Sequence, residues 1–136
     1  MTRQAQIVSG FILLTVPTII YGGYFLLQLL SSHHDDLQLT DFQKSMFRAG
    51  HGHAGLLVIL SILVQIFVDY ATLSNTWKWF ARLSFPTAAM LVSGGFFASA
   101  IGPNVTTANG FISILYVGVS ILMVGLVVLG VGLIRK

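Results

Sequence analysis

Four long apolar runs alternate with short polar segments along the chain. The runs cover about residues 7–30, 50–68, 79–101 and 111–134. Each contains the roughly 20 mostly apolar residues that a helix needs to cross the hydrocarbon core of a bilayer. Because the connections are short, consecutive helices are expected to be antiparallel neighbours. The pattern predicts an all-α polytopic membrane protein, in which residues 1–136 form a single antiparallel bundle of four transmembrane helices with short loops.

The second helix is predicted to begin before its apolar run. Thr40 is followed three residues later by Gln43, and this spacing is typical of a capping box at a helix N-terminus. We therefore expect the second helix to start near Asp41, outside the lipid.

The composition excludes several classes of protein. Hydrophobic residues make up 55% of the chain and charged residues only 8%, whereas soluble domains have roughly 25% charged residues. A soluble enzyme, a disordered chain and a nucleic-acid-binding protein are excluded, and the expected partner is the lipid bilayer. The absence of cysteine also excludes disulfides, thiolate metal sites and a cysteine nucleophile.

The few cations predict an orientation. With four spans, one side of the membrane receives Arg3, Lys78, Arg82, Arg135 and Lys136. Lysine and arginine are enriched in cytoplasmic segments. We expect both termini to be cytoplasmic, in a protein of the plasma membrane.

Two histidines near the outer end of the second span are the main candidates for chemistry. His51 and His53 point about 200° apart on a helix, so one small ion is not easily held by both. Neutral imidazole is the commonest metal ligand, and the neighbouring glycines let a flat ligand approach closely. The pattern favours a bound heme, a transition metal or another redox ligand at His51 and His53. It is similar, over three residues, to the pattern in core subunits of heme–copper oxidases, where each histidine faces a different heme.

Several polar residues on other helices are predicted to lie at the same depth as these histidines. A polar pocket in the outer leaflet could therefore form from His51 together with Arg48, Tyr21, Tyr24, Gln28 and Tyr116. The competing interpretation is that these side chains form hydrogen bonds between helices and anchor the helix ends at the membrane interface.

The second helix also carries a polar stripe. Arg48, His51, Gln65 and Asp69 share one face, with small and apolar residues between them. Because polar side chains are costly against lipid, this stripe should face the bundle interior or a subunit interface. It provides the basis for an alternative function, an oligomeric channel or small-solute transporter, although Gln65 and Asp69 could simply hydrogen-bond to other helices.

Glycines recur every seven residues on the fourth span. Gly118, Gly125 and Gly132 form a seam of small residues, which permits close helix packing in lipid. The seam could serve packing within one bundle or between copies. Because four short spans enclose little volume, we expect a homo-oligomer.

A second cluster of possible metal ligands lies in the first loop. His33, His34, Asp35 and Asp36 are consecutive and all are metal-ligand types. They could bind a divalent ion weakly, and the competing interpretation is a solvated polar turn.

Three functions are consistent with these patterns. The first is binding of heme, a metal or a redox ligand through the histidines of the second helix. The alternatives are the channel or transporter and an accessory or assembly subunit of a larger membrane complex. The absence of a nucleophile–base pair, a phosphate loop or a carboxylate dyad favours a protein that is not an enzyme.

Overall fold

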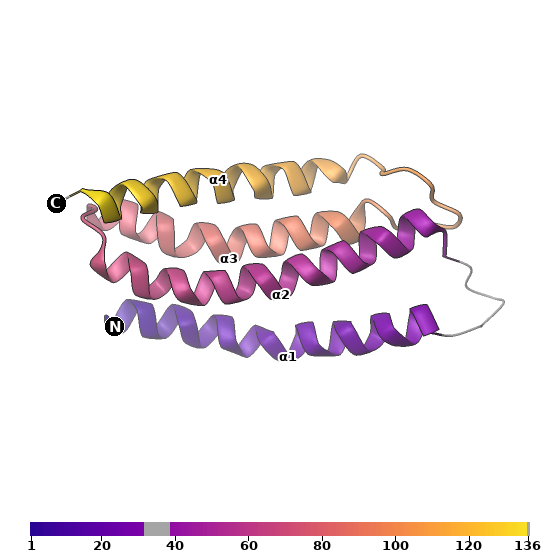
Figure 1. Ribbon diagram of the computed structural model, residues 1–136, viewed down its shortest axis with the longest axis horizontal. Helices are drawn as coiled ribbons and strands as arrows, with labels where there is room; N and C mark the ends of the chain where they lie inside the picture. The colour runs from indigo at the N-terminus through magenta and orange to yellow at the C-terminus, as the bar shows by residue number, and fades with distance from the viewer. Residues whose placement is uncertain (32–38, 136) are drawn as a thin grey trace.

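The computed structural model describes residues 1–31 and 39–135, and in this part of the chain the regular structure is entirely helical (Figure 1). The helices are α1 (Arg3–Ser31), α2 (Asp41–Tyr70), α3 (Asn75–Ala98) and α4 (Ile112–Ile134). The predicted all-α bundle of four helices is thereby confirmed. The candidate loop site at His33, His34, Asp35 and Asp36 lies outside the described residues.

The predicted start of α2 is correct, and its cap has a further role. Thr40 Oγ1 accepts a hydrogen bond from the Gln43 backbone N–H, and Gln43 Oε1 accepts one from the Thr40 N–H, each at 3.1 Å. The buried Gln43 amide also donates to the carbonyl oxygens of Ala100 and Gly102, at 3.0 and 2.8 Å. The cap of α2 therefore holds the connection between α3 and α4 in place.

The third helix begins and ends earlier than its apolar run predicts. It occupies Asn75–Ala98 instead of about residues 79–101. Its end is fixed by Asn109, whose side-chain amide donates to the Ala98 carbonyl at 3.1 Å and whose backbone N–H donates to Ser99 O at 3.0 Å. Because these bonds satisfy carbonyl groups that a continuing helix would use, the chain turns away after Ala98.

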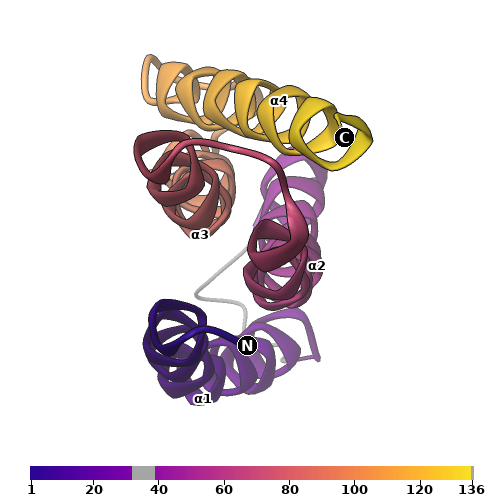
Figure 2. The same ribbon diagram turned by 90° about the vertical axis from the view of Figure 1, so that its left-hand side faces the viewer.

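Consecutive helices are antiparallel, and both chain ends lie at one end of the bundle (Figure 1). We call this the terminal end, which also holds the connection between α2 and α3. The opposite end, with the connection between α3 and α4, is the distal end. Viewed along the bundle, α2, α3 and α4 form a close group, whereas α1 lies beside α2 and is set apart from α3 (Figure 2).

The core lies between α2, α3 and α4. Val64 and Val68 of α2 pack against Phe85 of α3 and Leu129 of α4, and all four side chains are buried. The glycine seam of α4 faces the same group of helices. Gly118 lies against Val92 of α3 and Gly132 against Leu73 in the α2–α3 connection. The seam thus serves packing within one chain.

The outer surface of the bundle is apolar. Of the described helices, α1, α2 and α4 are long and apolar enough to cross a membrane. Large apolar side chains such as Leu14, Leu56 and Val127 are well exposed on them. A surface of this kind is expected against lipid tails and not against water. The third helix is less apolar because it contains Lys78 and Arg82.

Candidate functional site

A buried ion pair joins α2 and α3 toward the terminal end. Arg82 is only 1% exposed, and its Nη2 lies 2.5 Å from Asp69 Oδ1. Arg82 Nη1 donates to the backbone carbonyl of Gln65 at 3.1 Å. The Gln65 amide donates in return to the Arg82 carbonyl at 3.0 Å. Because polar groups in lipid are costly unless paired, these reciprocal bonds fix the rotation of α2 against α3.

The same carboxylate holds the start of α1. Asp69 accepts hydrogen bonds from the Thr2 backbone N–H at 2.6 Å and from Thr2 Oγ1 at 2.8 Å. Thr2 Oγ1 in turn accepts from the Ala5 N–H at 3.3 Å, which is the arrangement of a helix N-cap. Asp69 therefore links three helices through Thr2 and Arg82.

Arg82 corrects the interpretation of the charge pattern. It was expected beside the loop that joins the second and third spans, as an orientation signal at the membrane surface. It lies instead two helical turns inside α3, within the bundle. The sequence contained a signal for this pairing. Asp69 and Gln65 lie on an apolar helix and require a polar partner. Arg82 is a candidate for that partner, because it is four residues deeper in its helix than Lys78.

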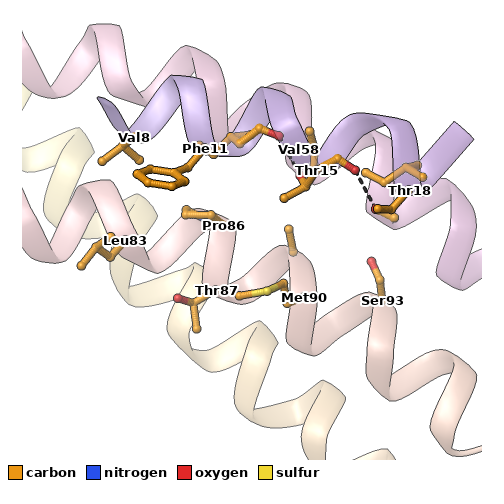
Figure 3. A pocket seen from close by; sticks show the side chains of 14 residues that line it. Val8, Phe11, Thr15, Thr18, Val58, Leu83, Pro86, Thr87, Met90 and Ser93 are labelled. Atoms are coloured by element: carbon orange, nitrogen blue, oxygen red, sulfur yellow. Dashed lines mark hydrogen bonds between the residues drawn. The ribbon is translucent and has the colours of Figure 1, made fainter. Parts of the chain in front are cut away.

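A large pocket lies between α1 and α3, with α2 as its floor (Figure 3). Its volume is about 570 Å³, within the range of small-molecule sites. Lining residues at its rim are well exposed, with Phe11 at 68% and Met90 at 69%, so the pocket opens at the side of the bundle. The lining consists of Val8, Phe11, Ile12, Thr15, Thr18 and Ile19 of α1, Ala54 and Val58 of α2, and Leu83, Pro86, Thr87, Ala89, Met90 and Ser93 of α3.

The pocket is apolar apart from hydroxyl groups. Thr15 donates to the Ile12 carbonyl at 2.7 Å and Thr18 to the Thr15 carbonyl at 2.6 Å, so both hydroxyl protons are used within α1. Ser93 differs, because its Oγ is buried and has no hydrogen-bond partner among the described residues. Figure 3 shows this hydroxyl directed from α3 toward α1. A buried polar group without a partner is a place where a ligand can supply one.

The two candidate histidines face different neighbours. The His51 ring lies against α1, so close to Gly23 that a Cβ there would be 2.8 Å from His51 Nε2. His53 is exposed, and its ring lies 4.9 Å from that of Phe96 on α3. His53 Nδ1 is 2.7 Å from the Ala49 carbonyl oxygen. Since a carbonyl can only accept, Nδ1 carries the proton, and Nε2 of the neutral ring keeps its lone pair.

The other residues of the predicted outer pocket come from three helices, α1, α2 and α4. Tyr21, Tyr24 and Tyr116 are 70%, 60% and 62% exposed, and Tyr116 is on α4, which has no contact with α1 in the described structure. Arg48 is exposed on α2, and Gln28 lies near the distal end of α1. Within the described residues, no group of three or more metal-ligand side chains comes together.

Comparison with known proteins gives no relative. No protein-family model, curated protein or solved structure matches this chain. The pocket and the polar contacts around it are therefore the basis for any functional proposal.

Proposed function

We propose that this protein binds a lipid-soluble small molecule, which enters the pocket between α1 and α3 from the bilayer. The observation that carries the proposal is the pocket of about 570 Å³ at the middle of the helices, apolar and open at the side. A pocket reached from the lipid receives ligands that are already dissolved there, because no aqueous path to it is needed.

The arrangement of the helices supports this proposal. The first helix is joined to the others through α2 along its length and through Thr2, Asp69 and Arg82 at the terminal end. It is set apart from α3 (Figure 2), and the pocket lies between these two helices. The bonds of Asp69 to Thr2 and Arg82 hold the start of α1 against α2 and α3.

Filling the pocket tests the proposal. Val58 lines the floor, whereas Val127 of α4 is 65% exposed on the far side of the bundle. The full chain would be purified in a mild detergent and examined by native mass spectrometry for a retained small molecule. We expect retention by the wild type and by Val127→Phe, and loss in Val58→Phe, because the larger ring occupies ligand space. Equal retention by both variants, or no small molecule on any of them, would contradict the proposal.

A second candidate function is ligation of heme or a transition metal at the distal end. The observation that favours it is the hydrogen bond of His53 Nδ1 to the Ala49 carbonyl, which leaves Nε2 as a free ligand atom on the bundle surface. Such second-sphere bonds are common for metal-bound histidines. His51 faces α1 instead, so the second axial ligand of a heme would come from another copy of the chain.

Heme titration in detergent distinguishes the roles of His51 and His53. We expect a Soret shift for wild type and His51→Ala, and none for His53→Ala, because His53 is the exposed one of the two histidines in the described part of the chain. Identical spectra for the wild type and His53→Ala would remove this candidate and would leave the pocket proposal unaffected.

A further inference from the structure

The lining of the pocket narrows the chemical class of its ligand. This inference rests on the proposed function, because it assumes that the pocket is occupied. Among the described residues, the lining contains no charged side chain. A charged headgroup inside the bilayer is costly without a counter-charge, so phosphate, carboxylate and ammonium groups are disfavoured inside this pocket.

The shape of the pocket favours an elongated ligand. The α1 lining runs from Val8 to Ile19, which is about 16 Å at 1.5 Å per residue. Over this length the walls are apolar side chains of Val, Phe, Ile, Leu, Met, Ala and Pro, and the polar side chains among them are the hydroxyl residues Thr and Ser. A single unbranched or isoprenoid chain lying along the helices matches this lining.

Ser93 provides one polar anchor at the distal end of the pocket. Its hydroxyl is buried and has no partner in the described structure, and it is directed toward the space beside Thr18 (Figure 3). The Thr18 proton is already donated to the Thr15 carbonyl, so Thr18 can only accept from a ligand. Ser93 can both donate and accept, so it can bind either a carbonyl or a hydroxyl oxygen, and unlike the other pocket hydroxyl groups its oxygen is a buried atom without a partner in the described structure.

We propose that the pocket binds an uncharged chain lipid that carries one hydroxyl or carbonyl oxygen, with this oxygen hydrogen-bonded to Ser93 and the tail directed toward the terminal end. Quinone-like, ketone and alcohol headgroups share this chemistry. Phospholipids, fatty acids and cationic amphiphiles do not fit this site, because their headgroups are charged.

Photolabelling in nanodiscs tests this assignment. Four probes with a diazirine in the tail would be used: dodecanol, methyl dodecyl ketone, dodecyl phosphate and dodecyl trimethylammonium. The labelled peptides would be mapped by mass spectrometry. We expect the alcohol, the ketone or both to label the segments 8–19 and 83–93 of the wild type strongly, and the charged probes to label them weakly. The relative yields of the alcohol and the ketone distinguish the two headgroups.

Ser93→Ala is the decisive variant, and Ser120→Ala is its matched control. Ser120 is exposed on α4 and donates to the Tyr116 carbonyl. Loss of one hydrogen bond in an apolar site should lower labelling by the preferred neutral probe about five-fold in Ser93→Ala, with no change in Ser120→Ala. Equal labelling by neutral and charged probes, or no effect of Ser93→Ala, would overturn the ligand class. Absence of any labelling in these segments would overturn the pocket function itself.

Discussion

Arg82 and Asp69 form an ion pair whose disruption is expected to destabilise the protein strongly. Their side chains are 1% and 11% exposed and lie 2.5 Å apart. A buried ion pair contributes little net stability over apolar residues, but removal of one partner leaves an uncompensated buried charge. The pair therefore selects one arrangement of α2, α3 and the start of α1, since rotations of these helices that separate the charges are strongly disfavoured.

Substitution of Asp69 alone should destabilise the bundle. Asp69→Asn keeps the shape of the side chain but removes the charge that compensates Arg82, and the expected loss is about 3 kcal/mol. Asp41→Asn is the matched control, because Asp41 is exposed beside Lys44 at 3.6 Å and such pairs contribute about 1 kcal/mol or less. Unfolding in detergent, followed by circular dichroism, measures both. The double variant Asp69→Leu with Arg82→Leu should recover part of the loss, and a further loss there would contradict this account.

The contact of α4 with α3 depends on glycines from both helices. Gly118 and Gly125 of α4 lie against Val92 and Ser84 of α3, and Gly95 of α3 lies against Leu115 of α4. In lipid, helices gain little from hydrophobic burial against each other, so close backbone contact supplies the attraction. The seven-residue spacing on α4 indicated such a contact. On α3 the buried small residues Ala81, Ala88 and Gly95 have the same spacing, although Gly95 is the only glycine among these three.

Gly95 should therefore be more sensitive to substitution than a glycine on the lipid side. A Cβ at Gly95 would lie 2.6 Å from the backbone nitrogen of Leu115, whereas a Cβ at Gly130 would meet no atom within 4 Å. We expect Gly95→Ala to cost about 1–3 kcal/mol of stability because backbone must shift, and Gly130→Ala to be neutral or slightly stabilising. Unfolding in detergent, followed by circular dichroism, measures the stability of both variants. Equal effects of the two substitutions would show that α3 and α4 are not in close contact at Gly95.

The surface of the whole bundle is mainly apolar, whereas the Arg82–Asp69 ion pair is enclosed between helices. The exposed surface includes Leu14, Leu56 and Val127. The orientation in the membrane stays a prediction, which rests on the cations at the terminal end. Arg82 no longer contributes to that signal, but Arg3 at the start of α1, Lys78 in the first turn of α3 and Arg135 after α4 remain there. The homo-oligomer stays a prediction, and the glycine seam no longer argues for it because α4 uses the seam within its own chain.

The chain lacks cysteine, so single cysteines can test the orientation. Thr76→Cys places a thiol at the terminal end and Thr106→Cys places one at the distal end, and both positions are exposed. On intact cells, a membrane-impermeant maleimide should label Thr106→Cys, whereas Thr76→Cys should require permeabilisation. Labelling of both from outside would contradict a membrane-spanning bundle, and the reverse pattern would contradict cytoplasmic termini.

The amino-acid sequence by itself determined the class of protein, the number and direction of the helices and the start of α2. These features depend on local properties: the length of each apolar run, the short connections and the spacing of Thr40 and Gln43. The close approach of α4 to a neighbour was also indicated, because Gly118, Gly125 and Gly132 recur along one face.

Only the tertiary structure decided which side chains meet. The pairing of Arg82 with Asp69, the opposite neighbours of His51 and His53, and the pocket ending at Ser93 depend on how each helix is rotated and how far it lies from the next. An apolar helix can turn several faces to lipid at similar cost, since lipid tails are as apolar as its side chains. Hydropathy therefore leaves the rotation open, and it is fixed by a few polar bonds and close glycine contacts between residues far apart in the chain.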